Sequence, residues 1–308
     1  MMPLVYILVL NWNAYRHTIS CVHSLLKLKY PNFKIVLIDN ASGDNSEAFL
    51  RAEFPDIDFI QSGSNLGYAG GNNVGLRYAL EHGADYIWIL NNDTRVDPLA
   101  LTALVEVMES NPEVGASGSK IYNMSDPKIL EFTGGFIDFV RGTNTVRGYL
   151  CVDEGQYDQK ECVEFLTGCS FLVRASVVHS VGLIIEDYFL YYEDVEWSWR
   201  ICEAGFKLMY VPESKLWHQG GASSGGGASP DVLYYMTRNR LYFFGRYCRP
   251  FQRFTATVWY IYWCTRYMTS LFVKQRNHFS IRSRAILQAW WDYLGRRAGP
   301  RFQLRALR

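Results

Sequence analysis

The sequence contains no Cys-x-x-Cys pair and no basic leader. Its seven cysteines are scattered along the chain, and their odd number argues against a complete disulfide framework. We therefore expect a protein of the reducing cytosol. The first ten residues hold no Lys or Arg and no cleavage site, so we interpret them as leading into the first strand instead of forming a signal peptide.

Two nucleotide-binding signatures are also absent. No GxxxxGK[ST] run occurs, and no GxGxxG follows the first apolar segment, which excludes a P-loop and a dinucleotide fingerprint. The sequence has no internal repeat, and its one low-complexity tract is the glycine-rich run at 220–227, which we expect to form a loop. With 308 residues and 49% hydrophobic content, the chain can build one large or two modest domains.

Acidic residues are almost missing from the C-terminal quarter. Residues 232–308 contain 15 Lys and Arg but a single acid, Asp292, and so carry a net charge of +14. The other 231 residues hold 16 basic and 29 acidic residues, a net charge of −13. The chain is therefore strongly asymmetric in charge, although its total is only +1.

The same C-terminal region is aromatic and is predicted to be helical from Asp231 onward. The run at 254–273 has the length of a membrane span, but it contains Arg266 and several Thr and Tyr. We therefore expect helices that lie on an anionic membrane surface, where aromatic rings sit at the headgroups and basic side chains meet acidic lipids. Two alternatives are a nucleic-acid surface, which we do not expect, and a helical subdomain with a solvated basic face.

The first 110 residues alternate between apolar strands and helices joined by short Gly, Asn and Asp connections. This order is typical of a doubly wound α/β fold, a mostly parallel sheet with helices on both faces. Asp97 and Pro98 are the expected N-cap and first position of one further helix. The predicted strands are 5–10, 35–38, 57–60 and 86–90, and the predicted helices are 17–26, 46–53 and 72–81.

Residues 111–230 show a weaker alternation of apolar strands and helices than the first 110 residues. Glu196 and Arg200, four residues apart, suit an ion pair on one helix, and Gly205 suits the end of that helix. We predict short strands and loops over 111–165, a strand over 165–174, a helix over 195–204 and strands over 207–211 and 215–218. The predicted organisation is a catalytic domain at 1–230, with halves at about 1–110 and 111–230, followed by a helical basic-aromatic region at 231–308.

Three segments place carboxylates at the ends of predicted elements. The apolar run Tyr86–Leu90 leads into Asn91, Asn92 and Asp93, and the run Ile35–Ile38 ends at Asp39. The third segment is Glu193 and Asp194 before the predicted helix. A lone strand-end Asp is often only a turn former, but α/β enzymes hold ligands at the carboxyl ends of their strands. The three segments together predict one active cleft.

Two loops of small polar residues are predicted to bind a ligand. The first follows Asp39 and contains Asn40 and Ser42, which can wrap a base or ribose with hydrogen bonds. The second is the Gly and Asn run at 65–73, which we expect to open a helix and to let backbone N–H groups approach a ligand. Its candidate residues are Asn65, Gly70, Gly71 and Asn72.

The ordered set of these motifs resembles glycosyltransferase family 2, most closely its bacterial rhamnosyltransferase-type members. The motifs are Leu10–Asn13, Ile38–Ser42, Asn65–Asn73, Leu90–Asp93 and Tyr192–Asp194, and the resemblance covers about residues 3–224. It implies a GT-A fold with a Rossmann-like sheet, a nucleotide-sugar donor, a divalent cation (Mg²⁺ or Mn²⁺) and inversion at the anomeric carbon.

The resemblance assigns donor-binding roles to the first half of the chain. Asp39 would contact the base, with Asn11 and Asn40 beside the nucleoside. Asp93 matches the last acid of the family's DxD motif, which binds a cation bridging the donor phosphates. Asn91 departs from the family pattern at the first Asp and removes one charge. The expected donor-binding set is Asn11, Asn13, Asp39, Asn40, Ser42, Asn65, Gly70, Gly71, Asn72, Asn91 and Asn92.

The resemblance assigns the reaction itself to the second half. Asp194 matches the catalytic base that accepts the proton of the acceptor hydroxyl, with Glu193 in reserve. An N-cap role is the alternative for Asp194. His218, in front of the glycine run, matches a further metal or phosphate ligand in some members, and a strand-end histidine is the plain alternative. The acceptor side would be formed by Thr167, Gly168 and Cys169, without a nucleophilic cysteine.

We predict an inverting glycosyltransferase on the cytoplasmic face of the cell membrane. It would transfer a sugar, with rhamnose as the candidate, from a dTDP, UDP or GDP donor to a glycan or polyprenyl-linked acceptor. One alternative is a nucleotidyltransferase, which would need a basic phosphate loop near the first strand, where only Arg16 is available. Another is a non-catalytic glycan-binding relative. The sequence leaves the donor base, the sugar, the acceptor and homo-oligomer formation open.

Overall fold

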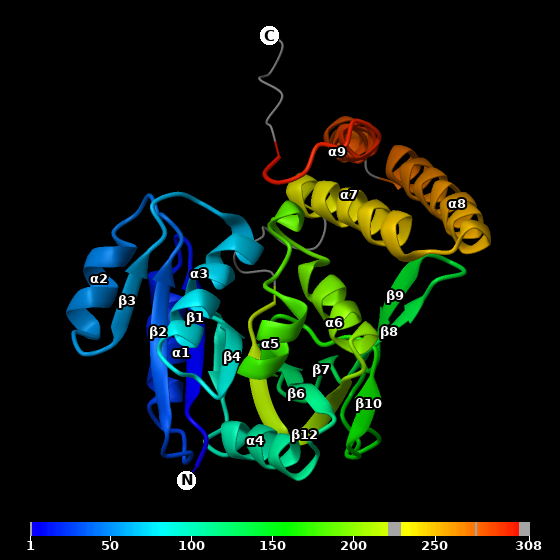
Figure 1. Cartoon of the computed structure of the whole chain (residues 1–308). Helices are drawn as coiled ribbons and strands as arrows, with labels where there is room; N and C mark the ends of the chain where they lie inside the picture. Colours follow the sequence, from blue (N-terminus) through cyan, green and yellow to red (C-terminus); the bar gives the residue numbers. More distant parts are fainter. Residues whose placement is uncertain (1, 221–228, 275, 302–308) are drawn as a thin grey trace.

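A mixed sheet of ten strands forms the centre of the molecule (Figure 1). The computed structural model describes residues 2–220, 229–274 and 276–301. Along the sheet the strands are ordered β10 (Glu161–Val163), β12 (Lys207–His218), β6 (Val114–Asn123), β11 (Ser170–Arg174), β4 (Tyr86–Asn91), β1 (Val5–Asn11), β2 (Phe33–Asp39) and β3 (Asp58–Gln61). Two short strands pair off this path, β5 (Thr94–Val96) with β12 and β7 (Leu130–Phe132) with β6. A separate hairpin consists of β8 (Gly135–Asp138) and β9 (Thr143–Val146).

The first half of the chain folds as the sequence predicts. Strands β4, β1, β2 and β3 are parallel neighbours, and their apolar runs are the predicted strands. Their connections carry helices α1 (Tyr15–Leu25), α2 (Ser46–Glu53), α3 (Gly67–Glu81) and, after β5, α4 (Ala100–Ser110). In the register of the sheet Asn11 lies opposite Asp39, and Leu10 lies opposite Asn91. The polar residues at the ends of three neighbouring strands therefore meet at one edge.

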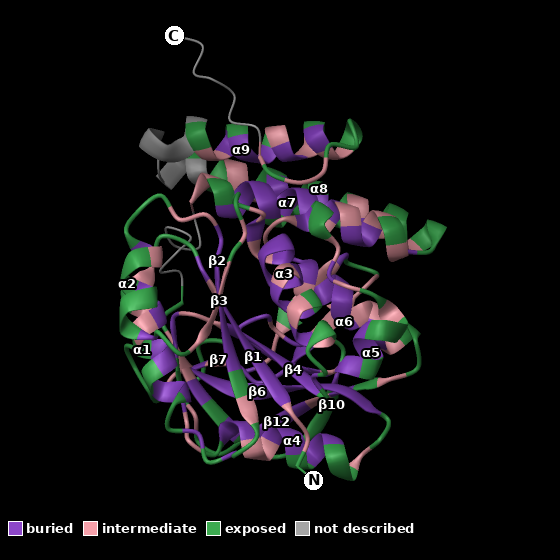
Figure 2. Cartoon of the chain, turned by 60° about the vertical axis from the view of Figure 1, so that its left-hand side comes forward, coloured by how far each residue is buried: buried purple, intermediate pink, exposed green. Residues whose placement is uncertain are grey.

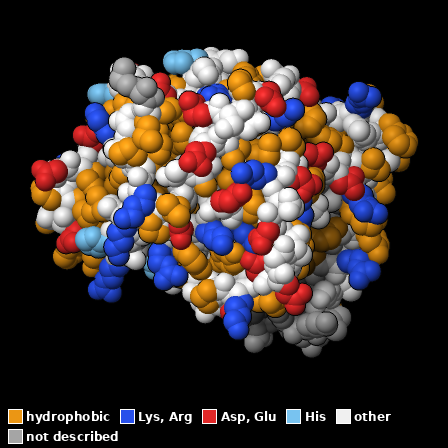
Figure 3. Space-filling view, turned by 90° about the horizontal axis from the view of Figure 1, so that it is seen from below, with side chains coloured by type: hydrophobic (Ala, Val, Ile, Leu, Met, Phe, Trp, Pro, Cys, Tyr) orange, Lys and Arg blue, Asp and Glu red, His pale blue; other side chains and the backbone are white. Residues whose placement is uncertain are grey.

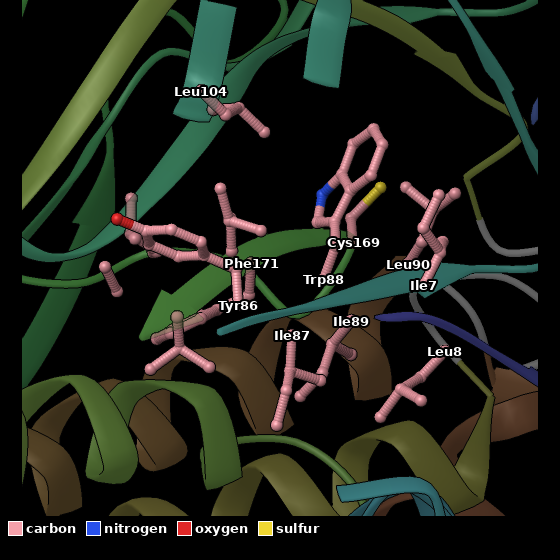
Figure 4. Packing of buried hydrophobic residues seen from close by; sticks show 14 of the residues in the cluster. Ile7, Leu8, Tyr86, Ile87, Trp88, Ile89, Leu90, Leu104, Cys169 and Phe171 are labelled. Carbon is pink, nitrogen blue, oxygen red and sulfur yellow. The ribbon is translucent and has the colours of Figure 1, made fainter. Parts of the chain in front are cut away.

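The core around β4 explains why its run of apolar residues is unbroken. Ile87 and Ile89 point to one face of the sheet, whereas Trp88 points to the other, toward the side of Leu104 from α4 (Figure 4). All of these side chains are at most 2% exposed. A strand buried on both faces needs no polar alternation, so its sequence shows none.

Helix α3 begins earlier than predicted, and this corrects the expected loop at 65–73. Its first residue is Gly67 instead of Asn72, so Gly70, Gly71 and Asn72 are helical. A Cβ atom on Gly71 would lie 2.6 Å from Cδ1 of Leu10. The glycines therefore permit close packing of α3 on β1, and their composition imitates a loop.

The bounds of other helices and strands also differ from the predicted ones. Helix α4 begins at Ala100, because Asp97 accepts a hydrogen bond from the backbone N–H of Leu99 (2.9 Å) and forms a turn before the helix. The region predicted as short strands contains the ten-residue, almost fully buried β6. The predicted strands at 207–211 and 215–218 are one strand, β12, with an irregularity between Val211 and Lys215.

The strand predicted over 165–174 is shorter, since β11 begins at Ser170 and runs antiparallel between β4 and β6. Three helical segments follow it: α5 (Ala175–Val181), the short 3-10 helix η1 (Glu186–Tyr188) and α6 (Glu193–Glu203). Helix α6 starts two residues before the prediction, so Asp194 lies inside its first turn. The predicted pair on this helix is confirmed, because Arg200 Nε donates to both carboxylate oxygens of Glu196 (2.9 and 3.0 Å).

Helices α7 (Pro230–Tyr247), α8 (Pro250–Lys274) and α9 (Arg276–Leu294) lie together at the end of the molecule opposite the N-terminus (Figure 1). Helix α7 is mostly buried, and Phe243 and Phe244 belong to the same core cluster as the central sheet. Helix α8 is mostly exposed, whereas α9 mixes buried, intermediate and exposed residues (Figure 2). None of the helices in the described ranges has the length and hydropathy needed to cross a membrane. The predicted glycine loop lies mainly in 221–228, outside the described residues.

At the end of the molecule that carries α4 and the N-terminus, basic and acidic side chains are mixed, unlike in the basic C-terminal region. Seen from this side, Lys and Arg are interspersed with Asp and Glu (Figure 3).

The predicted domain boundary near residue 230 stays a prediction, since α7 packs on the core formed by the residues before it.

Candidate active site

Asp39 is the centre of a buried hydrogen-bond network at the end of β2. One carboxylate oxygen accepts from Asn11 Nδ2 (2.7 Å) and Ser42 Oγ (2.6 Å), and the other accepts from Ser42 N (3.0 Å) and Gln61 Nε2 (2.9 Å). Burial alone would raise the pKa of Asp39, but the hydrogen bonds from Ser42, Asn11 and Gln61 lower it below its ordinary value. Asp39 is thus an ionised residue that shapes the loop after β2.

The neighbouring polar residues extend this network. Ser42 Oγ accepts from the backbone N–H of Asn13 (2.8 Å), and Asn13 Oδ1 accepts from Gly43 N (2.7 Å). Asn40 donates to Asn65 Oδ1 (3.1 Å) and to the Gly67 carbonyl (3.0 Å). The structure therefore brings together the predicted residues of the first loop with Asn11 and Asn65.

The start of α3 does not provide the free backbone donors that the sequence predicted. The N–H groups of Tyr68 (2.7 Å) and Ala69 (3.3 Å) donate to the Phe189 carbonyl, and Gly67 N donates to Asn65 Oδ1 (2.9 Å). Asn72 is fully buried and donates to the Tyr68 carbonyl (2.9 Å). Gly70, Gly71 and Asn72 pack inside the fold as part of α3, and their donor-binding role stays a prediction.

At the end of β4, Asp93 lies beside His218 of β12. His218 Nε2 is 3.2 Å from Asp93 Oδ1 and 3.3 Å from Asn91 Nδ2, and its Nδ1 is 2.7 Å from Oε2 of Glu131. Burial alone would lower the pKa of His218, but Asp93 and Glu131 raise it to about 9. Burial would likewise raise the pKa of Asp93, and the contact with His218 lowers it below its ordinary value.

These residues suit a divalent cation only with help from a ligand. No group of three or more His, Cys, Asp and Glu side chains able to hold an ion occurs among the described residues. Mg²⁺ is commonly bound through one or two carboxylates, with phosphates and waters completing its shell. Asp93 can supply one such position, and the Nε2 atom of His218 can supply a second once the cation displaces its proton, while Glu131 fixes the imidazole ring from its other nitrogen.

Asp194 is partly buried in the first turn of α6. Its Oδ1 accepts from Val195 N (2.8 Å) and its Oδ2 from Gly168 N (3.0 Å). Burial raises the pKa of Asp194 above the usual aspartate range, although these hydrogen bonds oppose the effect. A carboxylate with a raised pKa is a stronger proton acceptor, which suits a general base.

Glu193 has a different environment from its neighbour. It is 5% exposed, and among the described side chains its buried Oε2 atom has no hydrogen-bond partner. Burial and the charge of Asp194 raise the pKa of Glu193 well above its ordinary value. Asp194, by contrast, accepts two backbone hydrogen bonds that stabilise its charged form, which favours Asp194 over the reserve base Glu193.

The turn at 167–169 connects the two acidic positions. Gly168 N donates to Asp194, and the Cys169 carbonyl accepts from Asn91 N (3.2 Å). Tyr68 OH donates to the Gly168 carbonyl (2.6 Å), while Thr167 Oγ1 accepts from Cys169 N (3.3 Å). Burial raises the pKa of the Cys169 thiol, so this cysteine is held neutral. The end of β4 and the start of α6 therefore share one short backbone link.

Three residues of the site have no motif that would have revealed them. Gln61 at the end of β3 donates to Asp39, and Glu131 of β7 orients His218. Thr18 donates to Asn11 Oδ1 (2.7 Å) and accepts from Asn92 Nδ2 (2.9 Å), so it joins the ends of β1 and β4. Only the position of Gln61, just after a predicted strand, was a usable signal.

Solved structures share this architecture and identify it as a GT-A fold. A mannosyltransferase from Pyrobaculum calidifontis in complex with GDP-Man and Mn²⁺ has a TM-score of 0.60 at 14% identity, over 96% of this chain and 88% of that chain. GalNAc-T7 with UDP, GalNAc and Mn²⁺ has a TM-score of 0.61 at 16% identity, over 77% of this chain and 47% of that chain. The predicted fold class is confirmed.

The model of the family "Glycosyl transferase family 2" matches residues 6–180, and the chain belongs to this family. The hexosyltransferase Agl10 of low-salt glycan biosynthesis in Haloferax volcanii is 28% identical over 54% of this chain, which spans about half (52%) of that relative's length. The dTDP-rhamnosyl transferase RfbF of Shigella flexneri is 26% identical over 71% of this chain and 70% of its own. An N-acetylglucosaminyl-diphospho-decaprenol L-rhamnosyltransferase of Mycobacterium tuberculosis is 26% identical over 62% of this chain and 68% of its own length.

Proposed function

We propose that this protein is an inverting glycosyltransferase that transfers a sugar, with rhamnose as the first candidate, from a nucleoside-diphosphate donor to a hydroxyl group of a lipid-linked glycan or a surface polysaccharide precursor. The observation that carries the proposal is the turn at 167–169, which hydrogen-bonds both Asp194 and the backbone of Asn91. This link supports the proposal because it connects the candidate base to the end of β4, two residues before Asp93. Two rhamnosyltransferase relatives support the choice of sugar.

In the proposed reaction each end of the site has a separate task. Asp39 stays ionised and holds the loop that would receive the base and ribose of the donor. Asp93 and His218 would hold a Mg²⁺ or Mn²⁺ ion, which stabilises negative charge on a diphosphate leaving group. Asp194 would accept the proton of the acceptor hydroxyl as its oxygen attacks the anomeric carbon from the face opposite the leaving group.

Donor and cation can be identified together by thermal stabilisation. We expect one class among dTDP, UDP and GDP sugars to raise the melting temperature in the presence of Mn²⁺ or Mg²⁺ and to lose this effect with EDTA, because a ligand stabilises the folded state in proportion to its binding. Incubation of that donor with a polyprenyl-diphosphate glycan should then give a product with inverted anomeric configuration. Absence of stabilisation by every nucleotide sugar would contradict the proposal.

We also propose that α8 and α9 attach the enzyme to the cytoplasmic face of an anionic membrane. Exposed apolar residues recur along α8 at helical spacing, with Phe251 (73% exposed), Phe254 (67%) and Val258 (52%) followed by Ile261 and Tyr262. Exposed Arg253 and Arg266 lie on the same helix. Aromatic side chains combined with arginine suit the interface between headgroups and acyl chains, where a lipid-linked acceptor would be presented.

A further inference from the structure

The segment at 186–192, immediately before Glu193 and Asp194, has an unusual backbone. Phe189 (φ 63°), Tyr191 (φ 67°) and Tyr192 (φ 70°) all have positive φ angles, which side-chain-bearing residues rarely adopt. Three such residues within four positions persist only where the surroundings hold them. The direction in which α6 and Asp194 leave this segment therefore depends on its contacts.

The contacts from α7 come mainly from one carboxamide. Asn239 Nδ2 lies 2.8 Å from the Tyr188 carbonyl, 2.8 Å from the Leu190 carbonyl and 2.7 Å from the Tyr191 carbonyl. Asn239 is fully buried. The two N–H groups of one side chain thus lie within hydrogen-bond distance of three carbonyl oxygens, which bracket two of the residues with positive φ.

The neighbouring Arg238 fixes the orientation of that carboxamide. Its Nε donates to Asn239 Oδ1 (2.9 Å), and its Nη2 donates to the carbonyls of Asp187 and Tyr188 (3.1 Å each). Its Nη1 donates to the Gly299 carbonyl (2.6 Å) beyond α9. Arg238 is also fully buried, so these hydrogen bonds are shielded from water.

The opposite side of the segment is held by α3, but at fewer points. The Phe189 carbonyl accepts from Tyr68 and Ala69, and Glu186 accepts from Asn73 (2.9 Å). None of these bonds involves the carbonyls of Tyr188, Leu190 and Tyr191, to which Asn239 donates, with Arg238 sharing the Tyr188 carbonyl. Of the two helices that hold the segment, α7 therefore contacts the residue nearest to Asp194 in the sequence, Tyr191.

We propose that Asn239, oriented by Arg238, is a positioning residue for the base Asp194. Helix α7 then contributes a positioning residue to the active site, in addition to connecting the catalytic domain to the membrane-facing helices. The inference rests on the proposed function, because it assumes that Asp194 is the base. It adds that residues outside the motifs named in the sequence analysis set the angle at which the carboxylate meets the acceptor.

The test compares Asn239→Asp, Asn239→Ser and the control Met236→Ala, an exposed residue of the same helix. The Asp variant keeps the shape but turns an oxygen toward three carbonyl oxygens, and the Ser variant retains one donor. We expect kcat to fall about tenfold or more in Asn239→Asp and less in Asn239→Ser, with the KM for the donor within about twofold of wild type. A merely structural role would lower the amount of folded enzyme without this separation of kcat from KM.

Amide hydrogen exchange of the peptides covering 186–194 provides a second readout on the same variants. Faster exchange in these peptides, with unchanged exchange in β1 and β4, is the expected result. Unchanged exchange, or kcat within about twofold of wild type in a folded Asn239→Asp variant, would overturn the proposal. If the wild-type protein transfers no sugar, the proposed function fails, and the exchange result still decides whether Asn239 holds the segment. Should Asn239→Asp fail to fold, Asn239→Ser carries both readouts.

Discussion

The Nε2 atom of His218 lies 3.2 Å from Oδ1 of Asp93, although the two residues are 125 positions apart in the sequence. Strand β12 brings the histidine opposite Thr94, the first residue of β5, and so next to the turn that carries the aspartate. With Glu131 at its Nδ1 atom, the ring is held between two carboxylates. Asp93 and His218 are the residues that we propose as cation ligands.

Replacing Asp93 by Asn should abolish the stabilisation of the protein by a nucleoside diphosphate with Mn²⁺. A ligand at about 100 times its dissociation constant stabilises a protein by roughly 2.7 kcal/mol, so the loss is easily measured as a shift in melting temperature. Asp56→Asn is the matched control, because Asp56 is exposed and belongs to none of the predicted site motifs. Equal Mn²⁺-dependent shifts in both variants would remove Asp93 from the metal site.

Replacing Glu131 by Gln should weaken the cation site without removing a ligand. The carboxylate of Glu131 is 2.7 Å from Nδ1 of His218 and thereby orients Nε2 toward Asp93. Loss of such an outer partner typically costs about 10–100-fold in metal affinity. Titration with Mn²⁺ in the presence of the nucleotide measures this change. An affinity equal to that of the wild type would show that His218 does not depend on Glu131.

Gly67→Ala should destabilise the protein more than Gly83→Ala. Both glycines have positive φ angles (71° and 77°), so each substitution incurs a similar backbone cost of about 1 kcal/mol. A Cβ atom on Gly67 would lie 2.4 Å from the Phe189 carbonyl oxygen, whereas nothing lies within 4 Å at Gly83. Overpacking adds about 1–3 kcal/mol. Urea unfolding of the two variants measures the difference, and equal stabilities would show that α3 and the 186–192 segment are not in close contact.

The double substitution Phe254→Ser with Trp259→Ser should weaken binding to vesicles that contain an anionic lipid such as phosphatidylglycerol. Both side chains are exposed on α8, and transfer of one large apolar side chain from water is worth about 1.5–3 kcal/mol. We expect roughly a tenfold or greater loss in co-sedimentation. Deletion of 232–308 is a poorer test, since it would remove Phe243 and Phe244 from the main core.

The matched control for membrane binding is Leu99→Ser. Leu99 is 59% exposed and precedes α4, at the other end of the molecule from α8 (Figure 1). Its substitution should leave vesicle binding unchanged. Equal binding by the double variant and the control would contradict the membrane role of α8.

The sequence predicted the parallel half of the fold well because its signals there are local. Continuous apolar runs such as Tyr86–Leu90 are sufficient to predict strands buried on both faces. Helix α2 was predicted with its observed bounds, Ser46–Glu53. The start of α3 was missed, since tertiary packing against Leu10 requires glycines that a local reading interprets as a loop.

The site was predictable only where a motif marks it. Asp39, Asp93 and Asp194 stand at the ends of strands or at the start of a helix, and sequence position alone indicated them. Glu131 and Asn239 act through partners 87 and 48–51 residues away, respectively, and nothing in their local sequence distinguishes them from ordinary surface residues. Only the pairing of β7 with β6 and the packing of α7 bring them to the site.

The most direct measurement of the central claim is transfer by the Asp194→Asn variant, with donor binding measured in parallel. Asn keeps the size of the side chain but cannot accept the proton of the acceptor hydroxyl, so we expect unchanged Mn²⁺-dependent donor stabilisation and a loss of transfer of at least about a hundredfold. Asp56→Asn again serves as the control. Near-normal transfer by Asp194→Asn, with the donor bound as in the wild type, would contradict the assignment of Asp194 as the base on which this account depends.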